Sequence, residues 1–237
     1  METKVNINTE KDVIHVFHGN ALDPKAPLNI KIDGILDAPA QFLKNKKGGE
    51  LFEPKNCHVL VDKVGGKIEF IMNDKSAYGD KVVGKLKPSS LLSRFVINSE
   101  KRWSSYELQK FLKTVKFTFT ERAECDTMID SLNNFTVNVN KKIENYNNNN
   151  GNTRQAFETV VEGVKMKETF NLNLPVFEGY EKKKFTVSVG IDANNAQIRF
   201  FLFSDDLYIL ENDEREKLLA GQIAIFEEFG CSVVHIS

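Results

Sequence analysis

The strongest constraint on the fold is a run of alternating apolar and polar residues between positions 151 and 206. Lys184–Ile191 carries an apolar side chain at every second position, which is typical of a strand with one buried face. Gln197–Phe203 follows after Asn194-Asn195, a pair that tolerates the left-handed backbone of a tight turn. The two segments therefore predict a β-hairpin. Its second arm contains IRFFLF, which is apolar on both faces, so we expect a central strand or one covered by a helix.

Other segments carry similar strand signals. Arg154–Val161 and Lys165–Leu174 flank a short turn and predict a hairpin directly before the first one. Cys57–Val64 and Lys67–Met72 flank Gly65-Gly66, where both turn positions can take a positive φ. Further strands are expected at Lys11–His18, Leu28–Ile35, Lys81–Leu86 and Cys231–Ile236.

Segments with helical periodicity lie between these strands and after them. Apolar residues recur at i, i+3, i+4 and i+7 from Leu108 to Val115, and again from Cys125 onward, as on helices with one buried stripe. An Asn-rich helical stretch follows as far as Tyr146. The expected helix caps are Asp37, then Ser104 or Ser105, then Asn212 or Asp213, with Gly230 ending the last helix.

These elements predict an α+β fold, an antiparallel sheet of hairpins with amphipathic helices packed on one face. The chain divides into a β-rich part, 1–100, and a helix–hairpin–hairpin–helix part, 101–237. One continuous domain is the alternative, because no linker of disordered composition marks the boundary.

Composition excludes several classes of protein. The 237 residues are 41% hydrophobic and 27% charged with a net charge of −1, so no global field attracts nucleic acid or an anionic membrane. The three cysteines are too few and too widely spaced for a disulfide framework, which favours a reducing compartment. We expect no signal peptide and no membrane-spanning segment.

No stretch carries a catalytic or metal-binding signature. His15 and His18 would point to opposite faces of a strand, and Cys57-His58 has no second ligand pair, so no metal site is predicted. Cys125 lies on an apolar helix stripe, as an inert core thiol would. Phosphate-binding glycine loops and nucleophile elbows are lacking in the sequence. We therefore predict no catalytic residues, no cofactor and no enzymatic activity.

Two kinds of binding remain open. Basic side chains near aromatic ones could form a groove for single-stranded nucleic acid, and the candidates are Arg154, Lys165, Lys182, Lys183, Lys184 and Arg199. Self-association is the other possibility, because 18 Phe residues and the second apolar row of IRFFLF, with Phe201 and Phe203, permit burial between subunits.

The second half of the chain also resembles a known family. WSSYELQKFL is followed by a helical MIDSLNNF, by GNTRQAFETVVEGVKMKETFNLNLPVFEG, and by KFTVSVGIDANNAQIRFFLFSDD before an acidic-capped helix. This order is similar to that of the YfdQ-like family of uncharacterised phage and prophage proteins, over about residues 80–237. The resemblance implies a phage origin and action in the host bacterial cytoplasm, and it supplies no active-site residues.

The sequence predicts a non-enzymatic accessory protein that acts by self-assembly and binding, and the resemblance implies that a phage encodes it. The alternatives are a single-stranded nucleic-acid binder, or a binder of a small host signal or nucleotide in counter-defence. The expected partners are further copies of the chain and either a single-stranded nucleic acid or a host factor, without a membrane.

Overall fold

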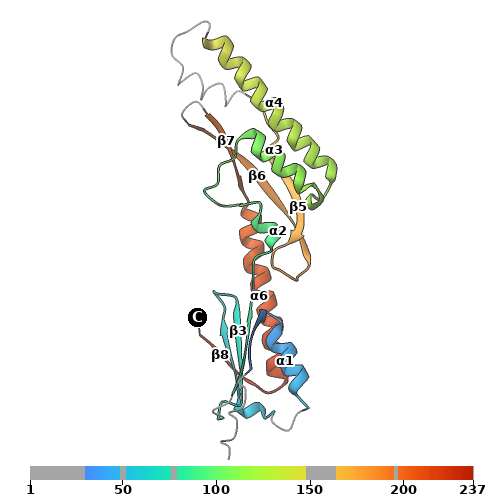
Figure 1. Cartoon of the computed structure of the whole chain (residues 1–237), viewed down its shortest axis with the longest axis vertical. Helices are drawn as coiled ribbons and strands as arrows, with labels where there is room; N and C mark the ends of the chain where they lie inside the picture. The colour runs from blue at the N-terminus through green and yellow to red at the C-terminus, as the bar shows by residue number, and fades with distance from the viewer. Residues whose placement is uncertain (1–29, 49–51, 76–78, 148–163, 195–196, 237) are drawn as a thin grey trace, which may run out of the picture.

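The computed structural model describes residues 30–48, 52–75, 79–147, 164–194 and 197–236. Two β-sheets lie one above the other along an elongated molecule, and each is covered by helices (Figure 1). The α+β class predicted from the sequence is confirmed. The predicted strand at Lys11–His18 and the first arm of the hairpin at Arg154–Val161 fall outside the described residues.

The first sheet has five strands in the order β1-β4-β3-β2-β8. Their bounds are β1 (Lys31–Ile35), β2 (Cys57–Asp62), β3 (Lys67–Met72), β4 (Asp80–Lys85) and β8 (Ser232–His235). The predicted β2–β3 hairpin at Gly65-Gly66 is confirmed, and Gly66 has a φ of 60°. β1 pairs in parallel with β4, and β8 pairs in parallel with β2. The expectation of a sheet made only of hairpins is therefore wrong for both edge strands, because long connections return them in parallel.

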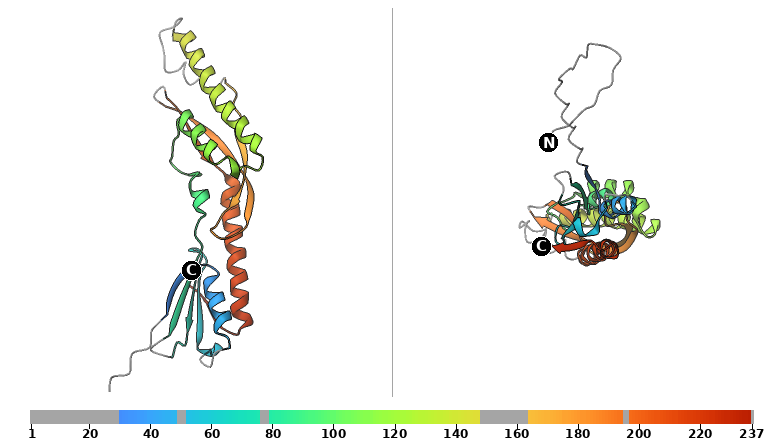
Figure 2. Two further views of the ribbon diagram at one scale, coloured as in Figure 1. Left: turned by 45° about the vertical axis from the view of Figure 1, so that its right-hand side comes forward. Right: turned by 90° about the horizontal axis from the view of Figure 1, so that it is seen from below.

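Helices cover one face of this sheet. The helix α1 (Ala38–Lys46) and the second half of α6 (Asp205–Glu228) pack on the face where alternate residues of β2 and β3 are buried (Figures 1 and 2). A short 3-10 turn, η1 (Pro54–Asn56), leads into β2. The rings of Phe70 on β3 and Phe226 on α6 lie 5.4 Å apart at the centre of this layer.

The second sheet has three antiparallel strands in the order β5-β6-β7. These are β5 (Thr169–Pro175), β6 (Lys182–Asn194) and β7 (Gln197–Phe203), and the predicted β6–β7 hairpin is confirmed. The helices α3 (Ser105–Thr114) and α4 (Arg122–Asn147) contact this sheet, where Phe200 and Leu202 are buried. The Asn-rich stretch to Tyr146 continues α4. The remaining short elements are α2 (Ser90–Ser93) and η2 (Lys116–Thr118).

Side-chain caps fix where the long helices begin. Ser104 and Glu107 form a reciprocal capping box at the start of α3. The last helix, α6, begins at Asp205, because the Ser204 hydroxyl accepts a hydrogen bond from the Leu207 N–H. The expectation that this helix starts at Asn212 or Asp213 is therefore wrong. With 24 residues, α6 is about 36 Å long, and it runs from the second sheet to the first (Figure 1).

A hydrogen-bonded network joins the two halves where the β5–β6 connection meets α1. The Tyr180 hydroxyl donates to Asp37 Oδ1 over 2.6 Å, and Gln222 Nε2 of α6 donates to the same oxygen over 3.1 Å. Asp37 precedes α1 as predicted, but its side chain makes no capping bond because it serves this network. The carboxylate thus ties both halves to α6.

Replacing Tyr180 by Phe is expected to alter how stability depends on pH. Burial, and then the bond to Asp37, raises the pKa of Tyr180, so the network stabilises the fold fully below the ordinary tyrosine pKa of about 10 and loses this contribution as pH rises. The variant should be about 1–2 kcal/mol less stable at neutral pH, with the gap narrowing above about pH 10. Urea unfolding of both proteins from neutral pH to above pH 10 measures this gap. A difference in the free energy of unfolding that stays constant over these pH values would contradict the prediction.

Candidate nucleic-acid interface

The face of the first sheet opposite α1 and α6 carries a cluster of lysines. Alternate residues of β1, β3 and β4 point to this side, and the side chains that reach it are half-buried or exposed. Five lysines line a shallow hollow of about 610 Å³ there, together with only two acids, Asp33 and Glu69. We call these lysines the lysine face: Lys31, Lys67, Lys81, Lys85 and Lys87.

Strand register places like charges beside one another. Lys31 on β1 lies opposite Lys81 on β4, and Lys67 on β3 lies opposite Lys85 on β4. Neighbouring strands are about 5 Å apart, so the two lysines of each pair lie side by side, and the two pairs are about 13 Å apart along β4. Like charges directly opposite each other in a sheet are destabilising. A fold that keeps two such pairs on one face concentrates positive charge at a cost in stability.

One carboxylate partly offsets this charge. Glu69, whose side chain is 13% exposed, pairs with Lys67 and lies 2.7 Å from Lys81 Nζ. Its hydrogen bonds to these two lysines hold its pKa below the usual range, and the same contact raises the pKa of Lys67. Glu69 therefore stays ionised and positions two of the five ammonium groups.

The other three lysines carry the remaining positive charge. Among the described residues, no ion pair involves Lys31, Lys85 or Lys87. Lys31, Lys85 and Lys87 are also exposed. The hollow therefore presents uncompensated ammonium groups to solvent, as a surface that contacts phosphates would.

Sequence reasoning missed this cluster because its lysines form no run. They are spread from position 31 to position 87 and come together only through the β1-β4-β3 register. The signal in the sequence is the period of two in KVVGKLK and in KID and KIE, which places each lysine on the polar face of a strand.

Among the basic residues predicted from the sequence, those that the structure describes do not form a common groove. Lys182 and Lys184 lie near the start of β6, while Arg199 lies opposite Asp192 near its other end. Lys184 and Asp192 are eight residues apart on one strand, a separation of about 26 Å. Lys183 pairs with Glu214 over 2.9 Å.

The last two residues of that prediction are Lys165 and Arg154. Lys165 is exposed in the segment before β5. Arg154 falls outside the described residues.

The predicted aromatic row lies on the other face of the second sheet from Phe200 and Leu202. Phe203 is 39% exposed, and its ring centroid lies 5.8 Å from that of Phe201. The Arg102 guanidinium lies 4.5 Å above the Phe201 ring and reaches Asp192 Oδ2 over 3.2 Å. Phe201 is therefore covered by a side chain of its own chain, and Phe203 is the more exposed of the pair.

The position of the Phe201 ring explains why β6 carries a glycine at position 190. Gly190 on β6 lies opposite Phe201, and a Cβ at Gly190 would lie 2.2 Å from the Phe201 ring. The aromatic ring thus occupies the space that a side chain on β6 would need.

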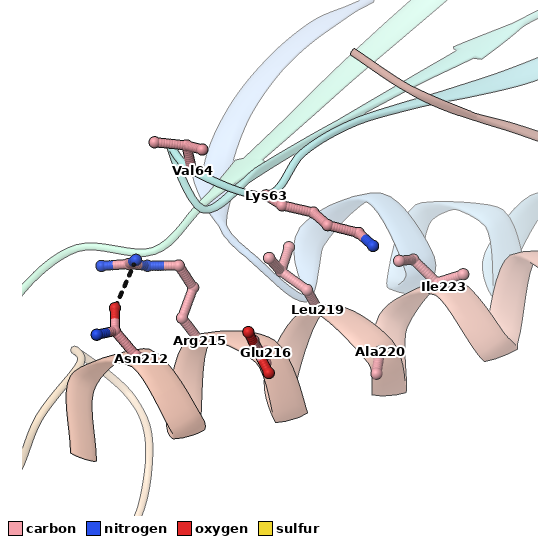
Figure 3. A pocket seen from close by; sticks show the side chains of 8 residues that line it. All are labelled: Lys63, Val64, Asn212, Arg215, Glu216, Leu219, Ala220 and Ile223. Carbon is pink, nitrogen blue, oxygen red and sulfur yellow. Dashed lines mark hydrogen bonds between the residues drawn. The ribbon is translucent and has the colours of Figure 1, made fainter. Parts of the chain in front are cut away.

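A second concavity lies between the β2–β3 turn and α6 (Figure 3). It measures about 510 Å³, and its floor is formed by one stripe of α6 that includes Leu219 and Ile223. Arg215 extends from α6 toward Val64 and donates a hydrogen bond to Asn212 over 3.1 Å. With Lys63 and Arg215 as its cations and Glu216 as its acid, this pocket is less basic than the lysine face.

Other functional groups are scarce in the part of the chain that the structure describes. No group of three or more His, Cys, Asp or Glu side chains there could hold a metal ion. Cys125 is buried, and burial raises its pKa to about 11, so its thiol is protonated at neutral pH. No described helix has the length and apolar character needed to cross a membrane.

The lysine face thus combines five lysines with two acids, and three of the lysines have no ion-pair partner among the described residues. Comparisons with models of protein families, with curated proteins and with solved structures gave no match for this chain.

Proposed function

We propose that this chain is a non-enzymatic binding protein that holds the phosphate backbone of a nucleic acid on the lysine face. The observation that carries the proposal is the cross-strand pairing of lysine with lysine, Lys31 with Lys81 and Lys67 with Lys85, on one side of a sheet. Phosphates would neutralise these charges and relieve the repulsion between them. Release of condensed counterions would then drive binding.

The chemistry of this face favours backbone contacts over base reading. The apolar residues beside the lysines are aliphatic, namely Ile35, Ile71 and Val83. Stacking of bases needs aromatic side chains, which these three positions do not supply. Most recognition of base edges uses planar bidentate side chains, and lysine is the one residue of this face that can also contact a base edge. Binding should therefore depend little on nucleotide sequence.

The salt dependence of binding tests this function. If all five lysines contact phosphates, the logarithm of affinity for a single strand should fall with a slope of about −3.5 against the logarithm of salt concentration. Affinity should then fall about 100-fold between roughly 50 and 200 mM salt. Fluorescence anisotropy with a labelled oligonucleotide, single-stranded and as a duplex, measures the slope.

A probe without phosphates supplies the matched control. A peptide nucleic acid of the same base sequence has a neutral backbone, so it should not bind. Equal binding of the two probes, or affinity for DNA that does not change with salt, would refute the proposal.

The proposed function also includes where the protein acts. The resemblance to the YfdQ-like family supports a phage origin and action in the host bacterial cytoplasm, where phage and host nucleic acids are both present. Under this proposal the protein is an accessory factor, with binding as its activity and no chemical step of its own.

Self-association through the second sheet is a second candidate. The partly exposed Phe203 beside Phe201 favours it, because two copies of this row would bury aromatic surface against each other. Light scattering after size exclusion should show an oligomer that Phe203→Ser converts to monomer. Tyr106→Ser, at a 74% exposed aromatic on α3, is the control and should leave the oligomer intact. A wild-type monomer at all concentrations would exclude this candidate.

A further inference from the structure

Cys57 is held at the first position of β2. The turn η1 ends there, and the Cys57 N–H donates to the Pro54 carbonyl. The Sγ atom donates to the Glu53 carbonyl over 3.4 Å, and the side chain is fully buried. The thiol thus points into the layer between the first sheet and α6.

Cys231 is held by the end of α6. Gly230, with a φ of 73°, adopts the left-handed conformation that commonly ends helices. The Gly230 N–H donates to the Glu227 carbonyl, and the Cys231 N–H donates to the Phe226 carbonyl. These two bonds form a Schellman motif, which fixes Cys231 directly before β8.

Strand pairing brings the two cysteines together. His58 on β2 is the register partner of Ser232 on β8, so Cys57 and Cys231, one position earlier in each, are neighbours across the parallel pair. Both side chains are buried, and burial raises the pKa of both thiols, while a hydrogen bond between the two has the smaller effect of lowering the pKa of Cys57 and raising that of Cys231. Adjacent strands are about 5 Å apart, which lies within the Cα separations that disulfides bridge.

We propose that Cys57 and Cys231 form a modification site that accepts a reversible disulfide from small-molecule disulfides such as oxidised glutathione. The Cys231 thiolate attacks one sulfur of glutathione disulfide, forms a mixed disulfide and releases one glutathione thiolate. The Cys57 thiolate then attacks the Cys231 sulfur and displaces the second. The protein loses two electrons and two protons, and these yield two molecules of reduced glutathione.

Access to the site depends on the C-terminal strand. Cys231 is 7% exposed, and β8 is a four-residue edge strand that pairs only with β2 in the described sheet. Opening of this short strand would expose the thiols without unfolding the sheet. Burial raises the pKa of Cys231 to about 11, so at neutral pH its thiol is protonated while β8 is closed, and the attacking thiolate forms when the strand opens. The closed disulfide would fasten β8 to β2 and slow this opening.

The full chain, incubated in buffers of increasing ratio of oxidised to reduced glutathione, tests the site by intact mass and by peptide mapping without reduction. The expected product is a monomer lighter by two hydrogens, with a peptide that joins Cys57 to Cys231. Cys125→Ser should give the same product, while Cys231→Ser should not. Hydrogen exchange of the amides at 232–236 should slow by at least about tenfold on oxidation.

Two results would overturn the proposal. One is a chain that keeps three free thiols at the most oxidising ratio. The other is a chain that carries only glutathione adducts or a bond to Cys125. Both are read on the wild-type protein, so they do not depend on whether a variant folds.

Discussion

Replacing Lys31, Lys85 and Lys87 together by glutamate is expected to weaken nucleic-acid binding by at least about 100-fold at low salt. These three lysines have no ion-pair partner among the described residues, so their replacement removes attraction without breaking a pair. Lys67 and Lys81 keep their contacts with Glu69, and the sheet should stay folded. The salt slope for a single strand should become less steep by about 2, since each lost phosphate contact contributes about 0.7.

A matched variant separates this local effect from net charge. Lys165, Lys182 and Lys184 are exposed on the other half of the molecule, and their replacement by glutamate changes the net charge by the same amount. Anisotropy titrations of this variant should show affinity within a few-fold of the wild type. If both triple variants lose binding equally, the overall charge and not the lysine face determines affinity.

Replacing Phe226 by alanine is expected to destabilise the protein by about 3–5 kcal/mol, the largest effect on folding that we predict. The Phe226 ring is fully buried and packs against Phe70 at 5.4 Å, so truncation leaves a cavity between α6 and the first sheet. α6 also contacts β6 in the second sheet, so loosening it should affect both halves.

Urea unfolding followed by circular dichroism measures this loss. Ile209→Ala is the control, because Ile209 lies on the same helix but is 59% exposed, and the change should stay within about 0.5 kcal/mol. Equal losses for the two variants would mean that α6 is not held by the Phe70–Phe226 contact.

Local patterns in the sequence were sufficient to predict most individual elements. The glycine pair at Gly65-Gly66 and the asparagine pair at Asn194-Asn195 located two hairpins, because turns of this kind need residues that tolerate a positive φ. Ser104 located the start of α3 for a similar local reason. The start of α6 was missed, because Asn212 and Asp213 are equally good caps in isolation. The Ser204 hydroxyl is additionally held by the Thr186 carbonyl, a contact 18 residues away.

Long-range pairing could not be predicted from these patterns. The parallel partners of β1 and β8 depend on connections through helices, and no short-range residue pattern specifies them. The candidate site depends on the same pairing, since Lys31 meets Lys81 only through the register of β1 on β4. The same holds for Cys57 and Cys231, which are far apart in the sequence but neighbours in the sheet. The aromatic row was located correctly on β7, but Arg102, which covers Phe201, comes from a segment with no strand or helix pattern.

Acetylation of lysines with a limiting reagent, measured for each residue by mass spectrometry with and without a bound oligonucleotide, shows which surface the nucleic acid covers. If nucleic acid lies on the first sheet, modification of Lys31, Lys85 and Lys87 should fall several-fold on binding, while Lys182 and Lys184 keep their reactivity. Protection of Lys182 and Lys184 without protection of Lys31, Lys85 and Lys87 would show that nucleic acid binds elsewhere than on the lysine face.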